Sequence, residues 1–148
     1  EASKVLKMKG YHADFFLIGD TDSLNPSAIP LQKILEWEKS GLISYLGYEQ
    51  QKNKIYSNVS LVCLPSYREG FPKVLLEGAS SGRPLIAFDV EGCRDIVVDG
   101  FNGFLVPPKD IDLLENTAKV RQWYELPANR LRERATSLFV SITNINLL

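Results

Sequence analysis

The chain has 148 residues, of which 45% are hydrophobic and 24% charged, the composition of one ordinary soluble domain. Its 17 basic and 18 acidic residues leave a net charge of −1, which excludes the basic footprint of nucleic-acid-binding proteins, so no nucleic acid is expected as a partner. Two cysteines are too few for a disulfide framework and lack metal-ligand spacing, so a reducing, cytoplasmic setting is expected. No apolar run reaches the roughly 18 residues that span a bilayer.

Short apolar segments alternate with amphipathic segments along the chain. Residues 3–9 resemble the last turns of a helix, and no strand precedes them. Strands are then predicted by runs rich in β-branched residues at 13–18, 43–46, 60–64, 84–88 and 103–106. Between and after these runs, helices are predicted at 31–39, 51–57, 72–81, 92–98 and 111–126. The alternation predicts an α/β fold, with a Rossmann-like, doubly wound parallel sheet covered on both faces.

The chain reads as a single domain over residues 1–148, because it contains no internal repeat or linker. Gly82 follows the helix predicted at 72–81, at the position where a glycine in the left-handed conformation commonly ends a helix, and Pro84 prevents that helix from continuing. Residues 137–148 mix β-branched with small polar residues, so their pattern does not separate strand from helix and the tail stays unassigned.

The start of the chain predicts a defect in the sheet. In a doubly wound sheet of order 3-2-1-4-5-6, the first strand is central. Since no strand precedes residues 3–9, that strand is expected to be missing, and the strands at 13–18 and 60–64 are expected to flank a gap with unpaired edges. The chain by itself is therefore expected to fold poorly and to be inactive.

An anion site is predicted where the strand at 60–64 leads into the next helix. Pro72 suits the first helical position, because its φ is preset and it has no N–H to leave unpaired. The first turn then leaves the N–H groups of Lys73, Val74 and Leu75 without intrahelical acceptors, and the helix dipole adds partial positive charge there. Gly70 allows a phosphate to approach the backbone closely.

Two glutamates flank this predicted anion site. Glu77 lies five residues into the helix, about 7.5 Å along its axis, and its two carboxylate oxygens suit a vicinal ribose diol. Glu69 precedes the helix, on the side where a sugar beyond a diphosphate would lie. Glu77 pairing with Lys73 on the helix surface is the simpler interpretation, but Lys before Glu is the weaker orientation for such a pair.

The segment Glu69-Gly70-Phe71-Pro72-Lys73-Val74-Leu75-Leu76-Glu77, with Pro65-Ser66 before it, resembles the signature of the family 4 retaining glycosyltransferases of the two-domain GT-B fold. The similarity continues in order through residues 82–84, 92–97, 99–100, 102–103 and 105–107, and covers about residues 9–119. This resemblance implies the C-terminal, donor-binding half of an enzyme that transfers a hexosyl unit, with retention, from a UDP- or GDP-sugar to an acceptor in polysaccharide or glycolipid synthesis.

The resemblance also implies roles for individual residues. Glu69 would contact the donor sugar as the catalytic residue, and Glu77 would hold the ribose. The base would lie beside Gly47 and Tyr48. The diphosphate would lie on the backbone of Gly70, Phe71, Lys73, Val74 and Leu75. The family usually needs no metal, so neither a metal nor another cofactor is expected.

The implied partners are a nucleotide sugar, an acceptor sugar or lipid-linked sugar, and a missing N-terminal acceptor-binding domain. With a lipid-linked acceptor, the complete enzyme would work at the cytoplasmic face of a membrane. The chain departs from the family where Gly78-Ala79 replaces Ala-Met, and it begins after the position of the basic Arg and Lys pair that neutralises the diphosphate. A non-catalytic nucleotide-sugar-binding module therefore stays open as an alternative, and a dinucleotide oxidoreductase ranks third because no Gly-x-Gly-x-x-Gly follows a first strand.

Overall fold

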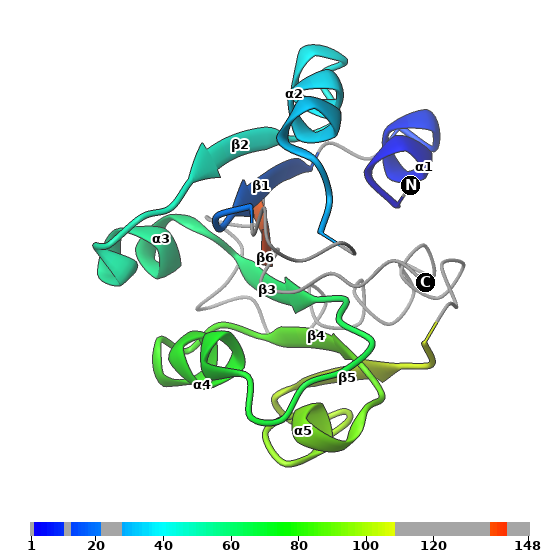
Figure 1. The fold of residues 1–148 in the computed structure, drawn as a ribbon. Helices are drawn as coiled ribbons and strands as arrows, with labels where there is room; N and C mark the ends of the chain where they lie inside the picture. The colour runs from blue at the N-terminus through cyan, green and yellow to red at the C-terminus, as the bar shows by residue number, and fades with distance from the viewer. Residues whose placement is uncertain (1, 11–12, 22–27, 109–136, 142–148) are drawn as a thin grey trace.

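The computed structural model describes residues 2–10, 13–21, 28–108 and 137–141, which form a six-stranded parallel sheet flanked by helices (Figure 1). In sheet order the strands are β2-β1-β6-β3-β4-β5. Their bounds in chain order are β1 Asp14–Ile18, β2 Ser44–Gly47, β3 Leu61–Leu64, β4 Leu85–Phe88, β5 Gly103–Val106 and β6 Ser137–Ser141. The helices are α1 Ala2–Met8, α2 Leu31–Lys39, α3 Lys52–Asn58, α4 Lys73–Ser80 and α5 Glu91–Arg94. The predicted α/β fold is confirmed.

Most of the predicted elements are found within one residue of their predicted ends, but α5 is much shorter than the helix predicted at 92–98. Asn102 explains this early end, because its side-chain amide donates to the carbonyl of Ile96 and its side-chain oxygen accepts from the N–H of Val98. These backbone groups are therefore held by a side chain rather than by a continuing helix. The helix predicted at 111–126 lies outside the described residues.

The predicted gap in the middle of the sheet is wrong. β6, which comes from the tail left unassigned by its sequence pattern, lies between β1 and β3 and pairs in parallel with both (Figure 1). Its register places Ser137 opposite Asp14, and Val140 opposite Cys63. The edges expected to be exposed are thus paired, and the central position is filled from the other end of the described chain.

Both faces of the sheet carry buried apolar side chains, which explains the continuous apolar runs of β3 and β4. Val62 and Leu85 belong to one cluster with residues of α4 and α5, whereas Cys63 and Ile86 belong to a second cluster with Phe88 and Val106. Such alternation on strands buried on both sides is typical of parallel sheets. A third cluster packs α2 against β1 and β2 through Leu17, Ile29 and Ile34.

The contact of α4 with the sheet explains the glycine that departs from the family pattern. A Cβ on Gly78 would lie 2.9 Å from Cγ2 of Val62 and 3.1 Å from Cδ2 of Leu85. Glycine therefore lets α4 sit directly on β3 and β4. As predicted, Gly82 follows the end of the helix in the left-handed conformation, with φ +68°. The N–H of Arg83 donates to the carbonyl of Gly78 over 3.0 Å, which completes a Schellman cap.

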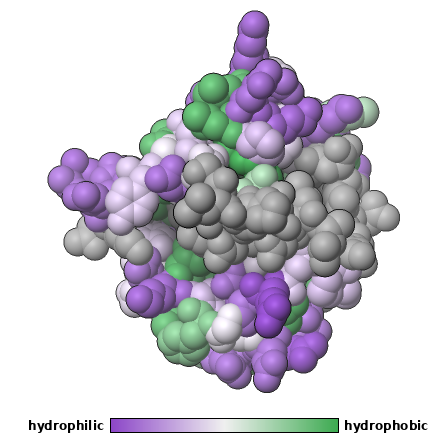
Figure 2. Space-filling model, in the orientation of Figure 1, coloured by the Kyte–Doolittle hydropathy of each residue, from purple (hydrophilic) through white to green (hydrophobic). Residues whose placement is uncertain are grey.

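The face shown in Figure 2 mixes hydrophilic and hydrophobic areas and has no continuous apolar surface among its coloured atoms. Among the described helices, none has the length and apolar character needed to cross a bilayer.

Candidate functional site

The carboxyl ends of the six parallel strands share one edge of the sheet, and the loop from β3 to α4 lies at this edge. Pro72 is the N-cap of α4, with φ −76° and ψ 98°, so the helix begins at Lys73, one residue later than predicted. The N–H of Leu75 donates to the carbonyl of Pro72 over 3.0 Å, and the Leu75 side chain is fully buried. The N–H groups of Lys73 and Val74 precede Leu75 in the first turn, where an α-helix leaves its N–H groups without intrahelical acceptors.

Gly70 sits before this helix with one side facing open space. A Cβ built on Gly70 would meet no atom within 4 Å, and its φ is outside the left-handed region. The glycine is therefore needed for an open approach to the backbone rather than for an unusual turn. On another side, the loop rests on Gly92, where a Cβ would overlap the carbonyl oxygens of Glu69 and Gly70. Gly92 at the start of α5 thus supports the loop by close backbone contact.

Glu69 has a partly buried side chain whose Oε1 atom is fully buried and has no hydrogen-bond partner within the described residues. The carboxylate also acts electrostatically on the thiol of Cys93. Burial, then the negative charges of Glu69 and Asp89, raise the pKa of Cys93 to about 11. A buried polar atom without a partner costs about 1 to 3 kcal/mol, and a charged one costs more, so this oxygen calls for an explanation.

Glu77 points toward α3 and accepts a hydrogen bond from the hydroxyl of Tyr56 over 2.8 Å. Tyr56 is 4% exposed, and its backbone carbonyl accepts from Nε of Arg83 over 2.7 Å, which ties α3 to the end of α4. The surface-pair interpretation expected Lys73, on the same helix, as the partner of Glu77. The structure instead records a bond to a buried residue of another helix.

Gly47 and Tyr48 lie at the same edge, at the end of β2. Gly47 has φ +64°, and its carbonyl accepts from the N–H of Gly19 over 3.0 Å. The carbonyl of Gly19 in turn accepts from the Tyr45 hydroxyl, also over 3.0 Å. Tyr48 is 68% exposed. Because β1 and β6 separate β2 from β3, about 14 Å lies between the two ends of the site.

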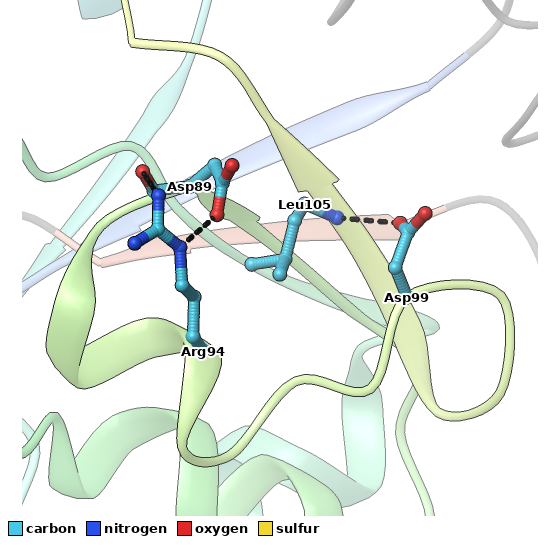
Figure 3. Close-up of polar contacts among 4 residues, drawn as sticks. All are labelled: Asp89, Arg94, Asp99 and Leu105. Atoms are coloured by element: carbon cyan, nitrogen blue, oxygen red, sulfur yellow. Dashed lines mark hydrogen bonds and ion pairs between the residues drawn. The ribbon is translucent and has the colours of Figure 1, made fainter.

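A further pair fixes the turn after β4. Arg94 of α5 donates through Nε to the carboxylate of Asp89 and through Nη2 to the Asp89 carbonyl over 3.3 Å (Figure 3). The hydrogen bond and charge of Arg94 lower the pKa of Asp89, so this carboxylate stays ionised. At the opposite end of β5, Oδ1 of Asp99 accepts from the N–H of Leu105 over 2.9 Å, as Figure 3 also shows. Both contacts hold turns of the sheet in place.

The predicted residues thus form two groups at one edge. Glu69, Gly70, Lys73 and Val74 lie together, with the exposed side chain of Phe71 beside them. Gly47 and Tyr48 lie three strands away. Sequence reasoning missed the bond from Tyr56 to Glu77, for which no local spacing gives a signal. It also missed the supporting role of Gly92, although that glycine belongs to the family pattern.

Comparison with known proteins identifies the family of this chain. The family described as "Glycosyl transferases group 1" matches residues 1–122. The chain belongs to this family. Among curated relatives, the N,N'-diacetylbacillosaminyl-diphospho-undecaprenol alpha-1,3-N-acetylgalactosaminyltransferase of Campylobacter jejuni is 32% identical over 91% of the chain and 34% of its own length. The UDP-Gal:alpha-D-GlcNAc-diphosphoundecaprenol alpha-1,3-galactosyltransferase of Escherichia coli is 30% identical over 88% of the chain and 33% of its own length.

Two solved structures share the fold of this chain. The pneumococcal O-GlcNAc transferase GtfA, solved with UDP and GlcNAc, matches 88% of the chain and 26% of its own chain, with 27% identity and a TM-score of 0.58. Alr3699/HepE of Anabaena, solved with UDP, matches 82% of the chain and 43% of its own, with 21% identity and a TM-score of 0.52. The fold expected from the resemblance to the GT-B glycosyltransferases is confirmed, and the chain spans about a third of the length of the curated relatives named above.

Proposed function

We propose that this chain binds the donor of a retaining glycosyltransferase, a UDP- or GDP-hexose, at the carboxyl edge formed by β2, β3 and α4. Membership of the family makes sugar transfer the reaction class. The relatives from Campylobacter jejuni and Escherichia coli are named for transfer to diphosphoundecaprenol-linked sugars. The proposed role is therefore polysaccharide or glycolipid assembly, with a lipid-linked or free sugar as acceptor.

The observation that carries this proposal is the buried Oε1 of Glu69, which has no hydrogen-bond partner among the described residues and belongs to the residue before the open backbone of Gly70. A donor-sugar hydroxyl that donates to Oε1 would remove the cost of leaving this atom unpaired. The carboxylate would then hold the sugar with its reacting carbon toward the acceptor. Since positioning of reactants supplies much of the catalysis in group transfer, Glu69 is the proposed catalytic residue.

The proposed diphosphate site is the first turn of α4. The N–H groups of Lys73 and Val74 point out of the helix end, where the partial positive charge of the dipole adds to them. The exposed Lys73 side chain adds a full positive charge. These donors would stabilise the charge that develops on the leaving nucleoside diphosphate, so the proposal requires no metal ion.

The remaining contacts of the donor follow the edge of the sheet. Glu77 would accept from the ribose hydroxyls, and the base would lie toward Gly47 and Tyr48. In the complete protein, a further domain would bring the acceptor, and a lipid-linked acceptor would place the reaction at the cytoplasmic face of a membrane.

The test is a titration of the isotope-labelled chain with UDP and with GDP, followed by backbone amide chemical shifts. The expected result is that shifts cluster at residues 69–75, at Glu77 and at residues 47–48. Shifts that cluster elsewhere, or the absence of binding by both nucleotides, would contradict the site. Binding by the complete protein without transfer to any acceptor would indicate the non-catalytic module instead.

A further inference from the structure

The hydroxyl of Tyr56 is hydrogen-bonded to the Glu77 carboxylate. It donates to Oε2 over 2.8 Å, and it also lies 3.4 Å from the carbonyl of Val74, one turn earlier on α4. Both acceptors belong to α4, whereas Tyr56 belongs to α3. The bond therefore joins two helices that leave the sheet at different strands.

Tyr56 is held firmly enough to direct a neighbouring group. Its side chain is 4% exposed and belongs to the main core cluster with Val59 and Leu75. Its backbone carbonyl is fixed by Nε of Arg83 over 2.7 Å. With both ends of the residue constrained, the hydroxyl cannot follow Glu77 if that side chain rotates, so it selects one rotamer of Glu77.

The hydroxyl keeps its proton and so remains a donor. Burial, the hydrogen bond to Glu77 and the charge of Glu77 all raise the pKa of Tyr56 above its ordinary value. Glu77 is therefore the acceptor in this hydrogen bond. A carboxylate has about four lone-pair positions, so one hydrogen bond at Oε2 does not saturate it.

We propose that Tyr56 is a positioning residue for nucleotide binding. Its hydroxyl fixes the Glu77 carboxylate for a vicinal diol and thereby sets the preference for ribonucleotides over 2′-deoxyribonucleotides. This inference rests on the proposed function, in which Glu77 binds the ribose. A carboxylate already held in place accepts two hydroxyls without loss of rotamer freedom. The diol-dependent part of the affinity, rather than the affinity for the diphosphate, is the quantity that Tyr56 controls.

The experiment measures calorimetric dissociation constants of the protein for UDP and GDP, and for the 2′-deoxy form of whichever binds more tightly. Tyr56→Phe keeps the buried ring and removes only the hydroxyl. The expected result is a ribonucleotide affinity about three- to tenfold lower and an almost unchanged affinity for the 2′-deoxy form. The ratio of the ribonucleotide affinity to the 2′-deoxyribonucleotide affinity should therefore fall toward the ratio measured for Glu77→Gln. Ile34→Val, a buried change in α2, serves as the stability-matched control and leaves the ratio unchanged.

Two contrary outcomes are distinguishable. If Glu77→Gln lowers the ratio but a folded Tyr56→Phe does not, the role of Tyr56 is overturned while the proposed function stands. If neither nucleotide binds the wild type, or Glu77→Gln leaves the ratio unchanged, the ribose site itself is wrong.

A second measurement needs no substitution. The Cζ chemical shift of Tyr56, which responds to the hydrogen bond of the hydroxyl, should change when the ribonucleotide binds and change less with its 2′-deoxy form. Equal shifts with both ligands would overturn the inference even if Tyr56→Phe failed to fold.

Discussion

Glu69 and Glu77 are both acidic residues of one short segment, yet their surroundings differ. Oε1 of Glu69 is buried without a partner in the described structure, whereas Oε2 of Glu77 accepts from Tyr56. The first carboxylate can gain a bond when a ligand arrives. The second is already oriented before a ligand arrives. At the scale of single residues, this difference separates the proposed catalytic role from the proposed binding role.

Glu69→Gln in the complete protein should therefore mainly lower kcat, and Glu77→Gln should mainly raise the dissociation constant of the nucleotide. Loss of a charged hydrogen bond costs about 1.5 to 3 kcal/mol, so each effect should be roughly ten- to a hundredfold. Steady-state kinetics and calorimetry on the same preparations separate the two effects. Equal and negligible changes in both variants would mean that neither glutamate contacts the donor.

The cysteines provide a second prediction at this scale. Burial raises the pKa of Cys63 to about 12, and burial with the charges of Glu69 and Asp89 raises that of Cys93 to about 11. Both exceed the ordinary value of 9.0, so the folded state disfavours the thiolate. This contribution to stability is complete below about pH 9 and is lost as the pH rises toward 11 and 12.

Because the thiolate is the reactive form, iodoacetamide at about pH 8 should label neither cysteine in the folded chain. Both should react when the chain is unfolded in denaturant. Mass spectrometry of samples taken over time measures the rates. Rapid labelling of Cys93 without denaturant would contradict its burial in the folded chain.

At the scale of elements, α4 connects the site to the sheet through Gly78. Alanine there would gain up to about 1 kcal/mol of helix propensity. Its Cβ, however, would lie 2.9 Å from the buried Val62, and such overpacking costs about 1 to 3 kcal/mol. Gly78→Ala should therefore lower the free energy of unfolding, as denaturant titration would show. Ser80→Ala, an exposed change in the same helix, is the control, and a stabilised Gly78→Ala would contradict the close contact.

The contact between two loops leads to another prediction at this scale. A Cβ on Gly92 would overlap the carbonyl oxygens of Glu69 and Gly70, which are backbone atoms and cannot rotate away. Gly92→Ala should displace the loop and weaken nucleotide binding about tenfold, on the order of one charged hydrogen bond. Glu91→Ala changes the exposed neighbouring residue and should leave binding unchanged. Unaltered affinity in Gly92→Ala would show that the loop position does not matter for binding.

At the scale of the whole molecule, the sheet depends on β6. This strand pairs with β1 and with β3, so it joins the half of the sheet made by β1 and β2 to the half made by β3, β4 and β5. Without it, two strands with buried apolar residues would have unpaired edges in the middle of the sheet. The continuity of the fold therefore rests on a segment far along the chain from the strands it joins.

Deletion of residues 137–148 should abolish the cooperative unfolding transition, because both edges of the centre would be exposed. Deletion of 142–148 alone, which keeps β6, should preserve it. Denaturant unfolding followed by circular dichroism compares the two variants at equal concentration. A cooperative transition of the wild-type midpoint in the longer deletion would show that β6 does not hold the sheet together.

The sequence by itself determined the parallel α/β fold, nearly all the described elements and the loop that carries Glu69 and Gly70. These features depend on patterns within about ten residues, such as apolar runs in β3, the proline at the start of α4 and the glycine at its end. Only the tertiary structure decided that the tail pairs at the centre of the sheet, that Gly78 and Gly92 lie against other elements, and that Glu77 is held by Tyr56. The physical reason is that strand order and side-chain contacts depend on which distant segments pack together, and a pattern within a few neighbouring residues does not specify that packing.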